Sequence, residues 1–337
     1  MGEGRIRTVF FGTPAYGVPT LDALAADRRF HVCLVVTQPD RPAGRGRVLQ
    51  APSVKEAALR WGLRTYQPAT LRDEEARRPL LEAEADVFVV AAYGLVFGRR
   101  TLALPRHGCL NLHASLLPRY RGASPVAAAI LNGDDQTGVS LMVMDAGLDT
   151  GPVVSQRRIP IEPDDTTDSL TRRLGDLAAI VAVDDIPRYL VGELVPWPQE
   201  ESGASRVRPL VKADGWLDWS ASAPDLERRV RAMWPWPRAW TTHEGAPVQV
   251  HRARVLRESH GGRPGELSIS SKGVAVACGT GSLRLEIVQP AGGKPVPATA
   301  WVAGRRLHSG ARLGETGAPP PPATPLIEWL ESPGQDE

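Results

Sequence analysis

Residues 86–92 read DVFVVAA, a run in which six consecutive side chains are apolar. A strand buried on one face alternates apolar and polar residues, whereas a strand covered on both faces is apolar throughout. The run therefore predicts a central strand of a parallel sheet with helices on both sides. Further strands are expected on either side of it, at Arg7–Phe11, His31–Thr37, Gly108–His113 and Gly138–Met144, and helices at Leu21–Ala26 and Val54–Trp61. Such alternation indicates an α/β fold with a doubly wound, mostly parallel, Rossmann-like sheet, whose ligands bind at the carboxyl ends of the strands.

The chain of 337 residues is long enough for about two domains. Glu162–Tyr189 is expected to close the first domain as a helix, with Thr166 or Thr167 as its N-cap. A polar segment rich in Pro, Gly and Ser, Glu193–Ser205, is interpreted as a linker. Beyond it, a helix at Leu226–Met233 and short strands bounded by turns predict a smaller β-barrel, OB-like.

These patterns divide the chain into four parts. The first domain is predicted to span 1–192, the linker 193–205 and the second domain 206–314. The remaining segment, 315–337, is rich in proline and is expected to be poorly ordered, although Leu326–Leu330 could dock weakly.

Charge is distributed unevenly between these parts. Residues 205–312 carry 17 Lys and Arg against 8 Asp and Glu, whereas residues 1–204 carry 23 against 25. A nearly neutral domain joined to a basic one favours a small substrate on the first and a polyanion on the second. On charge alone, a solvated Arg-rich surface explains the pattern equally well.

Two classes of protein are disfavoured by composition. The amino-terminal apolar run, Val9–Phe11, is shorter than a secretory signal, and no stretch approaches the ~20 apolar residues of a membrane span. The three cysteines show no metal-binding or disulfide spacing and are interpreted as free thiols of a reducing compartment. A cytoplasmic protein without membrane contact or metal is expected, and a monomer, because no apolar dimer stripe is evident.

The densest chemical signal is NLHASLLPRYRG at 111–122. Asn111 and His113 lie on one face of the predicted strand because side chains alternate along a strand. At the carboxyl end of that strand they would offer an amide donor and an imidazole to one small volume. Such a pair suits a reaction through a tetrahedral oxyanion. A hydrogen-bonded core pair is the commoner use of the same spacing.

A second candidate is the loop Asp145–Gly151, DAGLDTG. Glycines on both sides of Asp149 make a tight turn that can aim a carboxylate inward, where it would orient His113 or accept a proton from an amine. An Asp turn that caps the following segment is an equally good explanation.

With these motifs in place, the sequence resembles the methionyl-tRNA formyltransferase family from about Arg7 to Gly314. Motifs typical of folate-dependent formyltransferases occur in order, as do narrower ones of the tRNA enzymes: FFGTP at 10–14, TQPDRPAGRGR at 37–47, AAYGL at 91–95, NLHASLLPRYRGASP at 111–125, ILNGD at 130–134, DAGLDTG at 145–151, LDWS at 217–220, RRVRAMWPWP at 228–237 and VQPAGGK at 288–294.

The resemblance implies a role for each matching residue. It implies catalysis by Asn111, His113 and Asp149, and a 10-formyltetrahydrofolate co-substrate with no metal. The implied folate-contacting residues are Ser115, Leu116, Leu117, Pro118, Ala91, Ala92, Tyr93, Gly94, Leu95 and Asp145. It further implies that initiator methionyl-tRNA meets Arg41, Arg45 and Arg47, whose guanidiniums match phosphate geometry. A solvated surface turn is the alternative for this Arg loop.

The chain departs from the family pattern at Val126–Ala129, Arg206–Trp216, Trp234 and Arg238. These departures concern the details of tRNA contact more than the chemistry. Two other functions remain open: a folate-dependent enzyme that formylates a sugar amine or releases formate, and a non-catalytic tRNA-binding protein.

Overall fold

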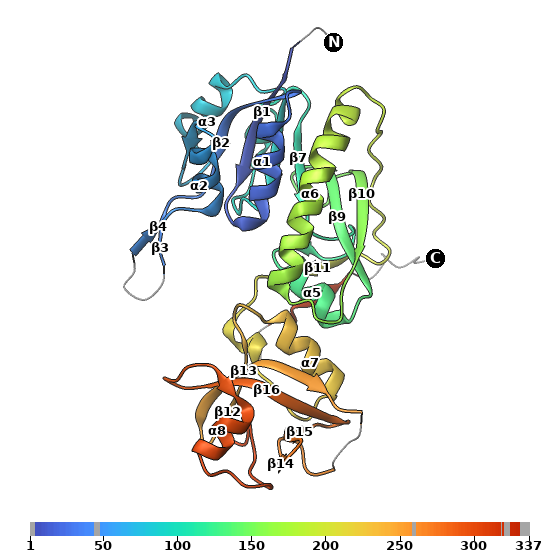
Figure 1. Cartoon of the computed structure of the whole chain (residues 1–337). Coiled ribbons are helices and arrows are strands. Elements are labelled where there is room, and N and C mark those ends of the chain that lie inside the picture. Colours follow the sequence, from blue (N-terminus) through green and yellow to red (C-terminus); the bar gives the residue numbers. More distant parts are fainter. Residues whose placement is uncertain (1–3, 44–47, 258–260, 318, 320–323, 331–337) are drawn as a thin grey trace.

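The computed structural model describes residues 4–43, 48–257, 261–317, 319 and 324–330. The chain forms two parts stacked end to end, an α/β part that contains α1–α6 and an antiparallel β part that contains β12–β17 (Figure 1). The described helices include none with the length and apolarity needed to cross a membrane.

A seven-stranded sheet organises the first part. Its strand order is β10-β9-β7-β6-β1-β2-β5. The central strands β7, β6, β1, β2 and β5 pair in parallel, whereas β9 and β10 add an antiparallel edge. In sheet order the bounds are Val153–Pro160, Gln136–Val143, Cys109–His113, Val87–Ala91, Ile6–Gly12, Phe30–Val36 and Thr65–Tyr66. The predicted mostly parallel sheet is confirmed.

Helices cover both faces of this sheet. Inward residues of one parity, such as Phe10 and Leu110, pack with α1 (Val18–Ala26), α2 (Ser53–Arg60) and α6 (Thr167–Leu190). Residues of the other parity, such as Phe11 and Cys109, pack with α3 (Glu74–Glu82) and α4 (Arg99–Leu102). All five residues of β6 are buried, as its unbroken apolar sequence predicts.

The closing helix α6 begins later than the sequence pattern indicates. Residues 162–165 form a turn in which the carboxylate of Asp165 accepts from the backbone N–H of Glu162. Thr166 is the N-cap, and it exchanges hydrogen bonds with Ser169 in a capping box. Strand β10 was not among the predicted strands, because its sequence VVSQRRIP is half-exposed and lacks a clean alternation.

The second part consists mainly of antiparallel strands, in the order β12-β13-β16-β15-β14 with β17 beside β16. Register irregularities in β13 between Val250 and Ala253 mark a bulge, which bends a strand. Helices α7 (Ala223–Ala232) and α8 (Ala298–Gly304) pack against the sheet. The strands β12 to β17 span Ala239–His243, Ala246–Val255, Leu267–Ser270, Gly273–Ala277, Ser282–Pro290 and Val296–Pro297.

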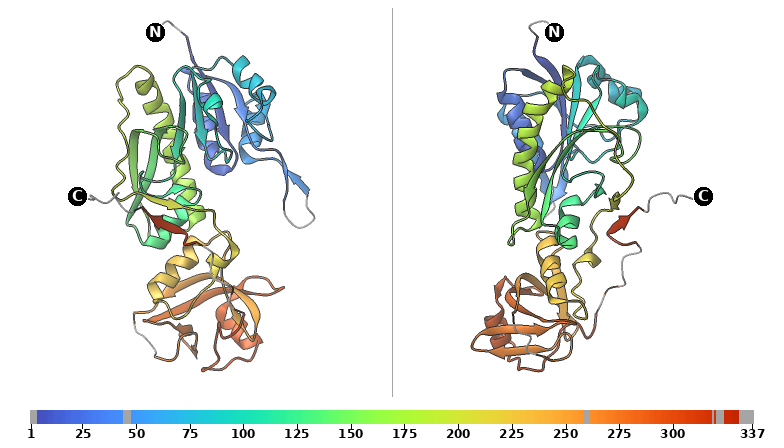
Figure 2. Two further views of the ribbon diagram at one scale, coloured as in Figure 1. Left: turned by 180° about the vertical axis from the view of Figure 1, so that it is seen from behind. Right: turned by 90° about the vertical axis from the view of Figure 1, so that its right-hand side faces the viewer.

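A small sheet joins distant segments beside the junction of the two parts. Strand β11 (Ser205–Val207) pairs in parallel with β8 (Arg121–Gly122) and in antiparallel with β18 (Ile327–Trp329). Figure 2 shows β18 lying against the first part. The expected poorly ordered segment 315–337 thus includes a paired strand, and the Trp329 ring packs edge-on against Tyr120 at 6.0 Å between centroids.

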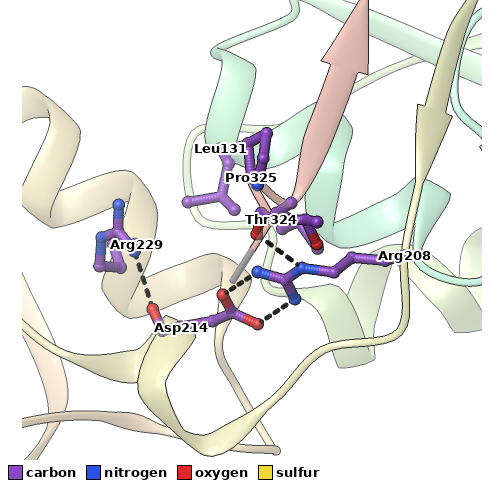
Figure 3. A pocket seen from close by; sticks show the side chains of 7 residues that line it. Leu131, Arg208, Asp214, Arg229, Thr324 and Pro325 are labelled. Atoms are coloured by element: carbon purple, nitrogen blue, oxygen red, sulfur yellow. Dashed lines mark hydrogen bonds and ion pairs between the residues drawn. The ribbon is translucent and has the colours of Figure 1, made fainter. Parts of the chain in front are cut away.

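A cavity of about 310 Å³ lies at this junction (Figure 3). Inside it, Arg208 forms a two-point ion pair with Asp214, and Arg229 of α7 donates to the Asp214 carbonyl. Its lining comes from α5 (Pro125–Asn132), the segment after β11, α7 and the segment before β18, namely Leu131, Arg208, Asp214, Arg229, Thr324, Pro325 and Leu326.

Candidate active site at the carboxyl end of the central sheet

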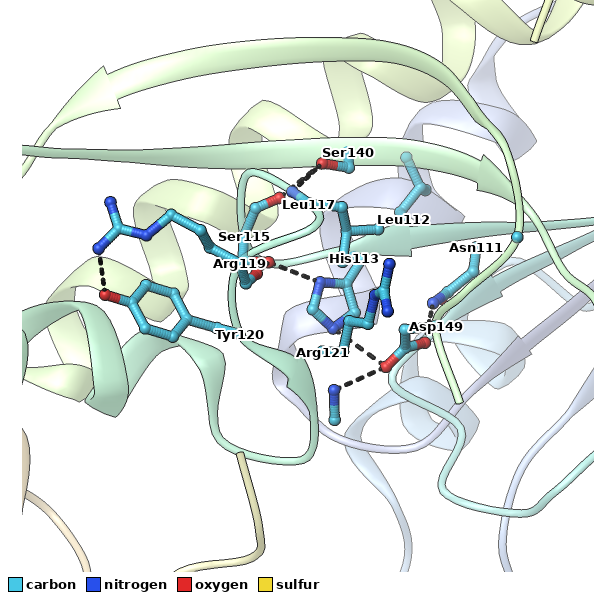
Figure 4. A network of polar contacts seen from close by, with 12 residues as sticks. Asn111, Leu112, His113, Ser115, Leu117, Arg119, Tyr120, Arg121, Ser140 and Asp149 are labelled. Atoms are coloured by element: carbon cyan, nitrogen blue, oxygen red, sulfur yellow. Dashed lines mark hydrogen bonds and ion pairs between the residues drawn. The ribbon is translucent and has the colours of Figure 1, made fainter. Parts of the chain in front are cut away.

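The predicted catalytic side chains meet at the end of β7 (Figure 4). Asn111 and His113 both reach the same carboxylate, that of Asp149. Asn111 Nδ2 lies 3.3 Å from Asp149 Oδ1, and His113 Nε2 lies 3.3 Å from Asp149 Oδ2. The latter is an ion-pair distance without the alignment of a hydrogen bond. The structure thus brings Asp149 to Asn111, which lies 38 positions earlier in the sequence, and to the neighbouring His113.

The tautomer of His113 follows from its contact with Ser115. The Ser115 hydroxyl donates its proton to the Arg119 carbonyl at 2.7 Å and lies 2.9 Å from His113 Nδ1. Since a hydroxyl has one proton to donate, Ser115 can only accept from the imidazole. Nδ1 therefore carries a proton, and Nε2 faces Asp149.

The loop that carries Asp149 holds it in a restricted backbone conformation. Asp149 has φ 54°, in the left-handed region that Asp and Asn tolerate better than most residues. Its Oδ2 also accepts the backbone N–H of Gly122 at 2.8 Å. Gly122 itself has φ 111°, and a Cβ there would lie 2.4 Å from the Val207 carbonyl oxygen, so the pairing of β8 with β11 requires glycine.

Electrostatics keep the Asp149 carboxyl ionised. Burial raises its pKa, but attraction from His113, the Gly122 N–H bond and the positive charge of Arg121 together lower it more. The pKa of Asp149 therefore lies below its ordinary value.

The four residues 115–118 after β7 alternate between buried and half-exposed side chains. Ser115 and Leu117 are buried, and Leu117 packs with Met142 and Val153. Leu116 and Pro118 are half-exposed, and these two present apolar surface. The loop is fixed from β9, where the Ser140 hydroxyl accepts from Leu117 N–H and donates to the Ser115 carbonyl.

The segment 91–95 begins at the last residue of β6. Because β6 is the parallel neighbour of β7, this segment lies at the same edge of the sheet as the end of β7. Ala91 is buried, and Ala92 is exposed with φ 55°. Tyr93 is buried against Phe11 and Phe97, so its ring is part of the core. The surface that this segment offers to a ligand comes from Ala92, Gly94 and Leu95.

Gly94 has φ 87°, and a Cβ there would lie 2.4 Å from the amide nitrogen of Gln38. That amide donates to the Tyr93 carbonyl. Asp145, the last predicted folate-contacting residue, is exposed and accepts from Gly147 N–H and the Thr150 hydroxyl, so its carboxylate shapes its own loop.

The predicted tRNA-contacting arginines lie on a different element. Arg41 begins the hairpin of β3 (Arg41–Ala43) and β4 (Val48–Gln50), which projects from the first part (Figures 1 and 2). The Arg41 side chain is exposed and donates to Gln38 Oε1 at 2.7 Å. Arg45 and Arg47 lie outside the described residues.

Three polar residues of the site were missed by sequence reasoning. Arg121 is 1% exposed and pairs with Glu201, while Gln199 donates to the carbonyls of Asp149 and Gly151. The only available signal for Arg121 was its place in RYRG, and for Gln199 and Glu201 the PQEE run in a segment interpreted as a spacer.

The described residues include no group of three or more His, Cys, Asp or Glu side chains that could hold a metal ion. The cluster of amide, imidazole and carboxylate instead has the donors and the base that acyl transfer to an amine requires.

Comparison with known proteins agrees with this chemistry. Residues 5–186 match the family model described as formyl transferase, and residues 209–306 match formyl transferase, C-terminal domain. Two solved structures share the fold. The N-formyltransferase from Helicobacter canadensis, solved with folinic acid and dTDP-3-aminofucose, has a TM-score of 0.63 at 15% identity, covering 83% of this chain and 99% of that chain. HypX from Aquifex aeolicus with tetrahydrofolic acid has a TM-score of 0.59 at 16% identity, covering 89% and 47%.

Two relatives found by sequence have a higher identity to this chain than these solved structures. The methionyl-tRNA formyltransferase of Roseiflexus castenholzii is 49% identical over 92% of this chain and 99% of that protein. The methionyl-tRNA formyltransferase of Neisseria gonorrhoeae is 46% identical over 91% of this chain and 100% of that protein. Both formyl transferase domains are thus matched in order by relatives that align along almost their whole length, and the chain belongs to the methionyl-tRNA formyltransferase family.

Proposed function

We propose that this protein transfers the formyl group of 10-formyltetrahydrofolate to the amino group of methionine on initiator tRNA. The observation that carries the proposal is the convergence of Asn111, His113 and Asp149 at the carboxyl end of the sheet. The family membership supplies the formyl transfer and a folate-derived donor.

The proposed reaction starts from a neutral amine. A free α-amino group has a pKa of about 7.7–8.0, and esterification of the carboxyl lowers it further. The amine is therefore substantially unprotonated near neutral pH and attacks the formyl carbon on N10 of the folate. No covalent enzyme intermediate is needed.

Asn111 and His113 hold the oxyanion that this attack creates. The Asn111 amide has two N–H groups, so it can keep its contact with Asp149 and donate the other proton to the oxyanion. His113, as a hydrogen-bonding imidazole or in its protonated form, would be the second group that holds the oxyanion. Its orientation is set by Ser115 on one nitrogen and Asp149 on the other.

Asp149 directs the proton transfers. Its ionised carboxylate accepts the proton that the attacking nitrogen must lose and passes it to N10 of the folate as the carbon–nitrogen bond breaks. The half-exposed Leu116 and Pro118 would contact the folate ring and limit access of water, which would otherwise hydrolyse the donor. The exposed Ala92 and Gly94 and the half-exposed Leu95 would also contact the folate.

The second part and the hairpin of β3 and β4, here called the Arg hairpin, are proposed to hold the tRNA. Residues 1–192 act as the catalytic domain, 193–205 as the linker and 206–314 as the tRNA-binding domain. The net charge of +9 over 205–312 supports a polyanionic partner. Arg41, Arg45 and Arg47 would contact backbone phosphates. The proposed setting is the cytoplasm, with the protein acting as a monomer.

The decisive experiment varies the acceptor. The purified protein is incubated with 10-formyltetrahydrofolate and either methionyl initiator tRNA, free methionine or no acceptor, and formyl-methionine and formate are measured. Rapid formylation of the charged tRNA with little reaction of free methionine is expected, because free methionine lacks the polyanion that positions the amine.

Other outcomes identify the alternatives. Formylation of free methionine at a comparable rate would refute the tRNA proposal. Rapid formate release regardless of acceptor would favour a hydrolase. Failure to consume the folate would leave a tRNA-binding protein without activity.

A further inference from the structure

The linker between the two parts touches the loop that carries Asp149. The side-chain amide of Gln199 donates to the carbonyl of Asp149 at 2.8 Å and to the carbonyl of Gly151 at 2.7 Å. Both of its N–H groups are therefore used on one turn of that loop. The amide oxygen of Gln199 accepts from Arg121 Nε at 3.0 Å, so all three polar functions of the side chain are engaged in the site.

Arg121 holds the other side of this arrangement. Its guanidinium is buried, and its two terminal nitrogens pair with the two carboxylate oxygens of Glu201 at 3.1 and 3.2 Å. A two-point pair of this kind fixes the plane of the guanidinium. The backbone of the adjacent Gly122 donates to the Asp149 carboxylate. Linker residues thus hydrogen-bond both to the backbone of Asp149 and to Arg121 of β8, the strand whose Gly122 binds the Asp149 carboxylate.

We propose that Gln199 is a positioning residue for Asp149, so that the interdomain linker forms part of the formyl-transfer site. This inference rests on the proposed function. Asp149 occupies a left-handed backbone conformation, and its carboxylate must face Asn111 and His113 together. Two hydrogen bonds to the carbonyls at and after Asp149 stabilise that turn against the extended conformations that are otherwise favoured.

A Gln199→Ala variant leaves both carbonyls without this donor. We expect kcat to fall about 10- to 100-fold, since a small misplacement of a catalytic group has effects of that order. The KM for the charged tRNA and for the folate should stay within about twofold of wild type, because Gln199 contacts neither proposed binding surface. Gln199→Glu keeps the volume but removes both donors, so its kcat should fall at least as far.

A double variant separates positioning from a general structural role. If Gln199 acts through Asp149, Gln199→Ala should lower the residual kcat of an Asp149→Ala enzyme by no more than about twofold. A loss in the double variant that equals the product of the two single losses would overturn the proposal. The exposed neighbour Glu200 provides the matched control, and Glu200→Ala should keep wild-type kcat.

Failure of this inference is distinct from failure of the proposed function. If the wild-type protein does not formylate charged tRNA, the proposed function fails. If it does, and Gln199→Ala and Gln199→Glu keep kcat within about threefold of wild type, only the positioning role fails. Thermal unfolding of every variant, followed by circular dichroism, establishes that each comparison is made between folded proteins.

Discussion

The proposed catalytic cluster of Asn111, His113 and Asp149 and the hairpin that carries Arg41 differ in how firmly the protein holds their charged groups. Asp149 receives contacts from Asn111, His113 and Gly122, and its loop is held from the linker. Arg41 is exposed at the base of a two-stranded hairpin, and its guanidinium contacts Gln38.

The difference corresponds to the tasks proposed for the two regions. Stabilising a transition state requires donors that are already oriented when charge develops, because reorientation during the reaction would cost part of the gain. Binding a phosphate backbone requires positive charge that can release counterions, and sequence-independent contacts tolerate adjustable side chains. Substitutions should therefore affect turnover in the first region and binding in the second.

The largest effect is expected from the catalytic cluster. Asn111→Ala should lower kcat about 10²- to 10³-fold by removing an oxyanion donor. His113→Ala should lower it about 10²- to 10⁴-fold, and Asp149→Ala at least as much. Single-turnover formylation of charged tRNA measures these rates.

Folate binding, measured by fluorescence titration, should remain close to wild type in all three variants. A variant that keeps turnover within about threefold of wild type would exclude that residue from the mechanism.

A smaller effect, on binding alone, is expected from the hairpin. Replacing Arg41, Arg45 and Arg47 together with Ala should weaken tRNA binding. Each lost phosphate contact should reduce the slope of log affinity against log salt by about one. Filter-binding titrations at several salt concentrations measure the slope, and folate titration is the control. An unchanged slope would show that the hairpin does not contact the tRNA backbone.

The smallest effect concerns stability and tests whether the Asp149 carboxylate is held as an ion. Because the folded-state pKa of Asp149 is depressed, its ionisation contributes stability at pH values above the unfolded pKa. That contribution is lost as pH falls through the folded pKa. Asp149→Asn should therefore be less stable than wild type at neutral pH, and the difference should shrink on acidification.

Urea unfolding at a series of pH values measures this difference in unfolding free energy. Asparagine suits the test because it tolerates the left-handed backbone conformation of this position. A difference that stays constant with pH would mean that ionisation of Asp149 does not contribute to stability.

Much of the sheet was predictable because its signals are local. The unbroken apolar run at β6 and the alternation at β7 follow from burial on two faces and from the strand period. The predicted face shared by Asn111 and His113 is confirmed by their common contact with Asp149. A threonine N-cap for α6 follows from side-chain chemistry, and of the two candidates, Thr166 and Thr167, Thr166 is the cap.

The parts that escaped prediction depend on non-local pairing. The sequence indicated that Leu326–Leu330 could dock, but the pairing of β18 within it with β11 has no local signature. The hydrogen bond between Gln199 and Arg121 joins residues 78 positions apart, so neither neighbouring sequence predicts it. The inward positions of Ser115, Leu117 and Tyr93 depend on the three-dimensional path of their loops.

The three-stranded sheet of β8, β11 and β18 can be completed only late in the synthesis of the chain. Its strands come from segments around Arg121, Ser205 and Trp329, and sheets built from such distant segments form slowly because long loops must close first. A nascent chain that has completed its seven-stranded sheet still lacks β18, whose Trp329 ring packs edge-on against Tyr120 and faces the Arg119 guanidinium. The segment from Arg119 to Gly122 contacts both Ser115 and Asp149. Trp329 must therefore be synthesised before this edge of the candidate active site acquires all of its contacts.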